Sequence, residues 1–191
     1  MPIGINGSGT ITGVSVGGLP DGIVDTDMLA AKTATAPKLG NGSILQVICA
    51  QKTDSFSTSS ASWNNVPSLQ ADITMTNASN KVLVQVNISA LNGTTTGSGA
   101  GVQRNGTFIG LGTSYGNRQN ISGAELYHDR NDVFRTSSFT ILDTPGAGTH
   151  TYVVLVDPNG NTLYVNRSEG DGDTDSYSRG TSDITLMEVA A

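Results

Sequence analysis

The sequence predicts an all-β protein, a jelly-roll-like β-sandwich knob, on three observations. Glycine is unusually common, with 24 of 191 residues, while charged residues make up only 14%. Aromatic residues make up only 5%, so a core must consist mainly of Val, Ile and Leu, and β-branched residues fit the pleated surface of a sheet. Roughly ten short apolar runs follow one another at spacings of about ten residues, separated by turn-forming residues, which is typical of sandwiches.

The first 42 residues differ from the rest of the chain. Their apolar alternations are short and interrupted by glycine, Leu19–Gly22 predicts a turn, and Asp25–Lys32 predicts one short helix that Pro37 prevents from continuing. Such a segment cannot bury a core of its own. We therefore expect residues 1–42 to be an extended docking or trimerisation segment, whose apolar residues become buried on assembly.

Residues 43–191 are expected to form one β domain. Lys81–Leu91 is the clearest strand, and Leu69–Met75 alternates in the same way. Asp183–Val189 is expected to close the sandwich. Ser43–Ala50 shows little alternation, so we expect it to be buried on both faces. The apolar residues expected on one face of the clearest strand are Val82, Val84, Val86, Ile88 and Ala90.

Two hairpins are expected within this domain. The Asn105–Gly106 pair lies between two apolar runs and predicts a two-residue hairpin loop. His150–Val156 is expected to pair with Thr162–Val165 in a second hairpin. Shorter strands are expected near Glu125–Tyr127 and Ser137–Asp143.

The charge balance excludes several classes of partner. The net charge is −6 and the basic residues are scattered, so we expect no nucleic-acid binding. The sequence has neither a secretory signal nor a stretch of transmembrane length, so we expect synthesis in the cytoplasm without membrane insertion. Cys49 is the one cysteine, which rules out an intrachain disulfide. Its apolar surroundings predict a small buried side chain rather than a reactive thiol.

Catalytic motifs are not evident. His128 lies in a polar run beside Asp129, and His150 begins a strand. A Ser-His-Asp site could be drawn around His128, but no nucleophile elbow frames it. We interpret the run around His128 as a solvated loop and expect no enzymatic activity.

The strongest chemical candidate is the acidic run Glu169–Asp175. Alternating carboxylates separated by small residues can converge on Ca²⁺, so Asp171, Asp173 and Asp175 are the candidate metal ligands. Serine occupies the sixth and twelfth positions counted from Asp171, so the EF-hand pattern fails. The alternative is a plain solvated acidic loop without a cofactor.

Four aromatic residues lie near polar, Gly- and Ser-rich stretches, where sugar stacking or contact with a partner is conceivable. They are Trp63, Tyr115, Tyr127 and Tyr177. We expect Trp63 to belong to the core. Tyr115 is the best candidate for an exposed ligand-binding residue.

Several strand and turn segments resemble a domain frequent in phage tail-fibre-like proteins, particularly those of aquatic bacteriophages. The segments that carry the resemblance are Gly42–Val47, Lys52–Thr58, Trp63–Val66, Ser79–Val84 and Arg179–Val189, preceded by the linker-like Gly18–Asp25. They cover most of the chain but include no catalytic motif. The resemblance implies a non-enzymatic virion component, usually trimeric, with a distal β knob, and it supplies no site residues.

The leading hypothesis is therefore a homotrimeric tail-fibre or short-appendage protein of the virion. Residues 1–42 would contact other virion proteins, and the knob would contact a glycan or protein on the host surface. A capsid decoration or head-fibre protein is the nearest alternative, because the chain is too short for a long shaft. A carbohydrate-binding module or a polysaccharide-cleaving spike is a more distant one.

Overall fold

The chain forms two compact units, Met1–Leu39 and Gly40–Ala191, in a computed structural model. The residues that the structure describes are 4–5, 11–12, 39–92, 97–128, 130 and 132–191. In the first unit, β1 (Gly4–Ile5) pairs antiparallel with β2 (Ile11–Thr12). The helix predicted over Asp25–Lys32 lies outside the described residues. Within the described part of the chain, no helix has the length and apolar character needed to cross a membrane.

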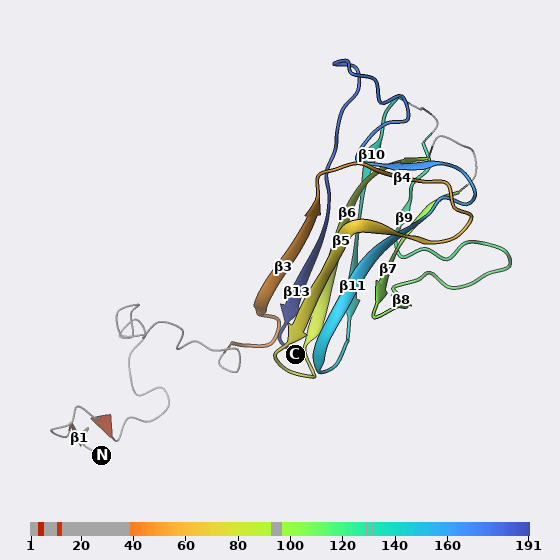
Figure 1. Cartoon of the computed structure of the whole chain (residues 1–191). Helices are drawn as coiled ribbons and strands as arrows, with labels where there is room; N and C mark the ends of the chain where they lie inside the picture. Colours follow the sequence, from red (N-terminus) through yellow and green to blue (C-terminus); the bar gives the residue numbers. More distant parts are fainter. Residues whose placement is uncertain (1–3, 6–10, 13–38, 93–96, 129, 131) are drawn as a thin grey trace. The chain divides into compact units, whose positions relative to one another are not determined.

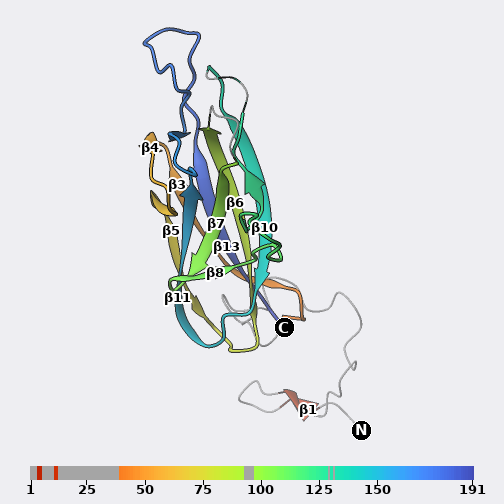
Figure 2. The same ribbon diagram turned by 90° about the vertical axis from the view of Figure 1, so that its right-hand side faces the viewer.

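The second unit consists of two antiparallel sheets, which confirms the predicted all-β sandwich (Figures 1 and 2). The first sheet runs in the order β3 (Ile44–Lys52), β13 (Ser182–Val189), β6 (Lys81–Asn92), β12 (Leu163–Val165) and β4 (Phe56–Thr58), with β10 (Arg135–Asp143) on the other side of β6. The second sheet runs in the order β5 (Asn64–Met75), β11 (Gly148–Asp157), β7 (Gly99–Arg104) and β8 (Thr107–Ile109), with β9 (Ala124–Glu125) paired to β7.

The core lies between the sheets and follows the alternation of the strands. On β6 the five residues expected on one face are all buried, and on β13 Ile184 and Leu186 join them. The second sheet contributes Leu69 and Ile73 from β5 and Tyr152 from β11. Because side chains alternate across a strand, each sheet directs one apolar face inward. Val, Ile and Leu therefore supply most of the core, as the composition predicts.

The first predicted hairpin is confirmed and the second is wrong. Asn105 and Gly106 both have positive φ, 49° and 82°, and connect β7 to β8. β11, however, pairs with β5 and β7, whereas β12 pairs with β4 and β6 in the other sheet. The connection between β11 and β12 thus crosses from one sheet to the other. The alternating pattern determines which face of a strand is buried, but it does not determine which other strand it pairs with.

The prediction that Ser43–Ala50 is buried on both faces is also wrong. β3 is an edge strand that pairs only with β13 among the described residues. Its outward face leaves Val47 57% exposed and Cys49 exposed. Cys49 is therefore exposed and not buried as predicted. The sequence of an apolar edge strand cannot be told apart from that of a strand buried on both faces.

A buried carboxylate stabilises one end of the sandwich. Glu188 of β13 accepts hydrogen bonds at Oε1 from the backbone N–H and Oγ1 of Thr76, both at 2.8 Å, and from Nδ2 of Asn80 at 2.7 Å. Its Oε2 accepts a hydrogen bond from Nε2 of Gln46 at 2.5 Å. Burial by itself would raise the pKa of Glu188, but these donors hold it below its ordinary value.

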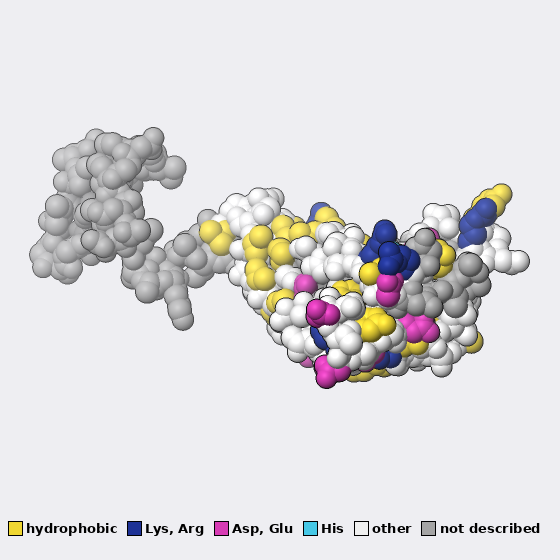
Figure 3. Space-filling view, turned by 90° about the horizontal axis from the view of Figure 1, so that it is seen from above, with side chains coloured by type: hydrophobic (Ala, Val, Ile, Leu, Met, Phe, Trp, Pro, Cys, Tyr) yellow, Lys and Arg dark blue, Asp and Glu magenta, His cyan; other side chains and the backbone are white. Residues whose placement is uncertain are grey.

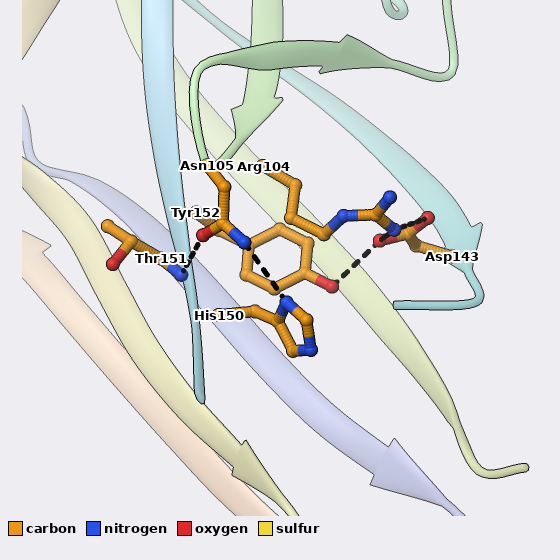
Figure 4. A network of polar contacts seen from close by, with 6 residues as sticks. All are labelled: Arg104, Asn105, Asp143, His150, Thr151 and Tyr152. Atoms are coloured by element: carbon orange, nitrogen blue, oxygen red, sulfur yellow. Dashed lines mark hydrogen bonds and ion pairs between the residues drawn. The ribbon is translucent and has the colours of Figure 1, made fainter. Parts of the chain in front are cut away.

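A second polar network fastens the two sheets together (Figure 4). Arg104 of β7 donates from Nη1 to both carboxylate oxygens of Asp143 on β10, at 2.7 and 2.6 Å. Tyr152 of β11 donates from its hydroxyl to Oδ2 of the same carboxylate at 2.8 Å. Because β10 belongs to the first sheet while β7 and β11 belong to the second, these bonds join the two layers.

The second unit has two distinct ends (Figure 1). At the base end, the chain enters the unit, and the N–H of Gly42 donates to the carbonyl of Ala190 at 2.8 Å. β3 and β6 both begin there and run toward the opposite end. At that loop end lie residues 126–128 and 132–134, which follow β9 and precede β10, and the connection formed by residues 166–181. The strands therefore separate the point where the chain enters from these two connections.

Candidate functional site

The loop end carries a hollow where the end of β6 lies beside the start of β10. Ala90 of β6 pairs with Arg135 of β10, which places this arginine at the rim. The loop beside it is fixed by backbone hydrogen bonds, from Leu126 to Ser98 at 2.9 Å and from His128 to Asn92 at 3.0 Å. The residues lining the hollow are Ala90, Glu125, Leu126, Tyr127, His128, Arg135 and Ser137.

The hollow presents a cation, an anion and an aromatic ring together. Glu125 and Arg135 are exposed, and neither forms an ion pair with any residue that the structure describes. Tyr127 is 39% exposed. An aromatic face combined with charged hydrogen-bonding groups suits a polar ligand such as a sugar or a peptide. Of these three residues, only Tyr127 stood out in the sequence, because Glu125 and Arg135 come together only through strand pairing.

The two histidines lie in separate settings. His128 is buried, and its Nδ1 accepts a hydrogen bond from the backbone N–H of Arg130 at 3.0 Å. The interpretation of this run as a fully solvated loop is therefore wrong for the histidine, although Asp132 nearby is exposed. His150 is buried on β11 toward the base end, where Asn105 donates from Nδ2 to its Nδ1 at 3.1 Å (Figure 4).

The acidic loop is organised by arginines rather than as a set of converging carboxylates. Asp171 forms ion pairs with Arg167 and with Arg179, whose backbones also form a β-bridge. Partial burial would raise the pKa of Asp171, but the hydrogen bonds from both guanidinium groups lower it. Both arginines were missed in the sequence, because they flank the loop and meet only when it closes.

The calcium prediction gains no support from this geometry. Asp173 and Asp175 are exposed, while Asp171 is already neutralised by its two arginine partners. Across the described parts of the chain, no three carboxylate, histidine or cysteine side chains are grouped as a metal site would require. The loop instead surrounds a shallow hollow with Tyr177 at its side.

The base of this loop is held by a buried asparagine. Asn166 has a φ of 60° and donates from Nδ2 to the backbone carbonyls of Lys52 and Asp54, both at 3.0 Å. Its Oδ1 accepts a hydrogen bond from Oγ of Ser182 at 2.7 Å. Because Asn166 and Ser182 bracket residues 167–181, this bond closes the loop at its neck.

Tyr115 is 73% exposed, as predicted, on the loop that follows β8. The guanidinium carbon of Arg118 lies 4.9 Å from the centroid of its ring, a cation–π contact. Tyr115 lies on the loop after β8, whereas the acidic run lies on the loop after β12. Trp63 is half-buried and packs against Phe108 with a centroid separation of 4.9 Å, so it fills the rim of the core.

No protein-family model matches this sequence, and no curated protein matches it.

Proposed function

We propose that this chain is a non-enzymatic structural protein of a bacteriophage virion, a homotrimeric component of a tail fibre or short appendage. The observation that carries the proposal is the separation of the two ends of the sandwich. The chain enters at the base end beside Gly42, and the hollow around Tyr127 and Arg135 lies at the loop end. A particle protein that attaches at one end and contacts a surface at the other needs this separation.

The attachment in this proposal belongs to residues 1–42. They precede the sandwich, and their sequence contains short apolar alternations without enough residues for a separate core. Other virion proteins are the partners expected for this segment. Three copies of it would supply one another with the apolar contacts that one copy cannot make.

The host contact in this proposal belongs to the loop end. The hollow offers Arg135 and Glu125 as charged groups and Tyr127 as a stacking surface, which fits a glycan or a polar protein segment on the host cell. The exposed ring of Tyr115 offers a second contact on another loop. The two polar networks support this role, because they stiffen the sandwich from which these loops extend.

Gold-labelled antibodies against the purified protein test the proposal on intact particles of the source phage. Label on the tail or its appendages is the expected result. Label confined to the capsid would assign the chain to capsid decoration or a head fibre instead. Particles without label, with protein found only in the lysate, would contradict a virion role. Cleavage of host polysaccharide by the purified protein would contradict the non-enzymatic part.

A further inference from the structure

The outer face of the first sheet carries a row of apolar side chains across four adjacent strands. Met187 of β13 lies opposite Val47 of β3 on one side and opposite Leu83 of β6 on the other. Leu83 in turn lies opposite Leu142 of β10. Directly paired residues point to the same face of a sheet. Val47 and Leu142 are each 57% exposed, so the row is open to solvent at both edges of the sheet.

A second apolar pair extends this row toward the base end. Val189 lies opposite Ile44, which is 55% exposed, and on its other side opposite Lys81. Because side chains alternate along a strand, Val189 and Met187 share the outer face. The two rows together form a contiguous surface, which we call the apolar patch. It consists of Ile44, Val47, Leu83, Leu142, Met187 and Val189.

The same face becomes polar toward the loop end. The next row consists of Cys49, Thr185, Gln85 and Thr140, and the row after it of Gln51, Asp183, Asn87 and Ser138. Single exposed apolar residues are ordinary on a soluble protein, but a contiguous apolar area bordered by polar residues marks an interaction surface. The interaction surface is therefore confined to the base half of this face.

The charge distribution favours a second copy of the chain as the occupant. The chain has a net charge of −6, so copies repel one another at most surfaces. The two rows of the patch contain no carboxylate, and Lys81 is their one ionisable side chain. Asp183 lies two rows away on this face, and Glu188 points to the opposite, inner face. Acidic copies therefore meet here with little repulsion.

The position of the preceding chain points to the same occupant. The N–H of Gly42 donates to the carbonyl of Ala190 at 2.8 Å, and the N–H of Ala190 donates to the carbonyl of Ser43 at 2.9 Å. The chain thus enters the sandwich at Gly42, directly beside Ile44 and Val189. In copies that meet through the patch, the points where the chain enters each sandwich lie near one another, as an assembly segment requires.

We infer that the apolar patch is the surface through which copies of this chain join. This inference rests on the proposed function, which supplies the number of copies, and it names the surface that the proposal leaves open. Burial of the six apolar side chains would stabilise the assembly. The first polar row would lie at the rim of the contact, and the second would remain in water.

Sedimentation velocity of the full-length chain tests the inference with two matched double variants. The patch variant Val47→Lys, Leu142→Lys places two charges in the apolar row. The control variant Gln51→Lys, Ser138→Lys places the same charges on the same two strands, in the second polar row. All four residues are exposed, so both variants should keep their fold, as circular dichroism would verify. We expect three chain masses for the wild type and the control variant, and one chain mass for the patch variant.

Two results would overturn the inference. One is a wild type that sediments as one chain, and the other is a patch variant with the mass of the wild type. If the wild type is a single chain and the patch variant is also lost from particles, the patch contacts a different virion protein. Gold labelling of particles is independent of these masses. Labelled particles together with a single-chain wild type would reject the patch as a homotypic interface and leave the virion role standing.

Cys49 provides a second readout that needs no substitution. Its thiol is exposed on β3 in the row next to the patch. We expect a maleimide reagent to modify Cys49 faster once dilution has separated the copies, since a partner covering the patch would hinder access to the thiol. A rate that is independent of concentration, with the assembled mass present at the higher concentration, would place the contact elsewhere.

Discussion

Asn80 donates a 2.7 Å hydrogen bond from Nδ2 to Oε1 of Glu188, a residue 108 positions later in the chain. The carboxylate is fully buried. Its donors, on Gln46, Thr76 and Asn80, all lie far from Glu188 in the sequence. This contact therefore forms only when the segments at the base end of the sandwich are packed together.

Replacing Glu188→Gln should destabilise the domain by about 2 kcal/mol. The amide keeps one acceptor for Thr76 and Asn80 but turns a donor toward Nε2 of Gln46, which also donates. Urea unfolding at neutral pH would measure the loss. Glu169→Gln, at an exposed position of the acidic loop, is the matched control and should change stability little.

Acid should weaken the domain through the same carboxylate. The pKa of Glu188 is lower in the folded chain than in the unfolded one, so its contribution is complete above the ordinary value of about 4.3 and is lost as the pH falls through the folded pKa. We expect the free energy of unfolding of the wild type to fall below about pH 4.3. In Glu188→Gln this fall should be shallower, and parallel curves would contradict the assignment.

Removing one hydroxyl should loosen the contact between the sheets. Tyr152→Phe removes the 2.8 Å hydrogen bond to Asp143 but leaves the ring in the core, so a loss of about 1 kcal/mol is expected. Thermal unfolding would detect it. Tyr164→Phe keeps the ring under the guanidinium of Arg167 and serves as the control with little expected change. Equal losses in the two variants would show that the bond to Asp143 contributes nothing.

Two glycines with similar backbone angles should differ in tolerance to alanine. Gly110 and Gly116 have φ of 62° and 60°, so alanine strains both. A Cβ on Gly110 would also lie 2.8 Å from Ile141, whereas a Cβ on Gly116 would have open space around it. Gly110→Ala should therefore lower the melting temperature clearly more than Gly116→Ala. The reverse order would contradict the packing of this loop against β10.

Substitutions at the hollow should weaken attachment to host cells, if the proposed role is correct. Arg135→Ala and Tyr127→Ala each remove one of the groups that line it, and a loss of about tenfold in affinity is expected for a charge-assisted contact. Lys81→Ala removes an exposed charge at the base end and should leave binding unchanged. Binding of labelled protein to cells would compare the three, and an equal loss in Lys81→Ala would point to non-specific charge attraction.

The sequence predicts strand faces better than strand partners. The alternation of β6 and the Asn105–Gly106 turn are local features, and both are found where expected. The pairing of β12 with β4 and β6 depends on the crossing between sheets, which no short motif encodes. The exposure of Cys49 has the same cause, since the chain pattern does not reveal that β3 lies at an edge.

The candidate site is less predictable for a related reason. Exposure of Tyr115 follows from its glycine-rich loop, and the structure confirms it. Arg135 and Glu125 line the same hollow only because β10 pairs with β6 and the loop after β9 folds back. The ion pairs of Asp171 with Arg167 and Arg179 likewise depend on closure of a loop whose sequence has no regular periodicity.

The orientation of β3 has a mechanical consequence. The chain enters at the base end, and β3 runs from there toward the loops with its whole length paired to β13. If the sandwich is held at both ends, as in the proposed function, a pulling force would act along this strand. The ladder of hydrogen bonds would then be loaded in shear, with many bonds resisting at once, instead of being peeled open one by one. If the proposed function is right, the sandwich would in this way resist sudden tension between its two ends.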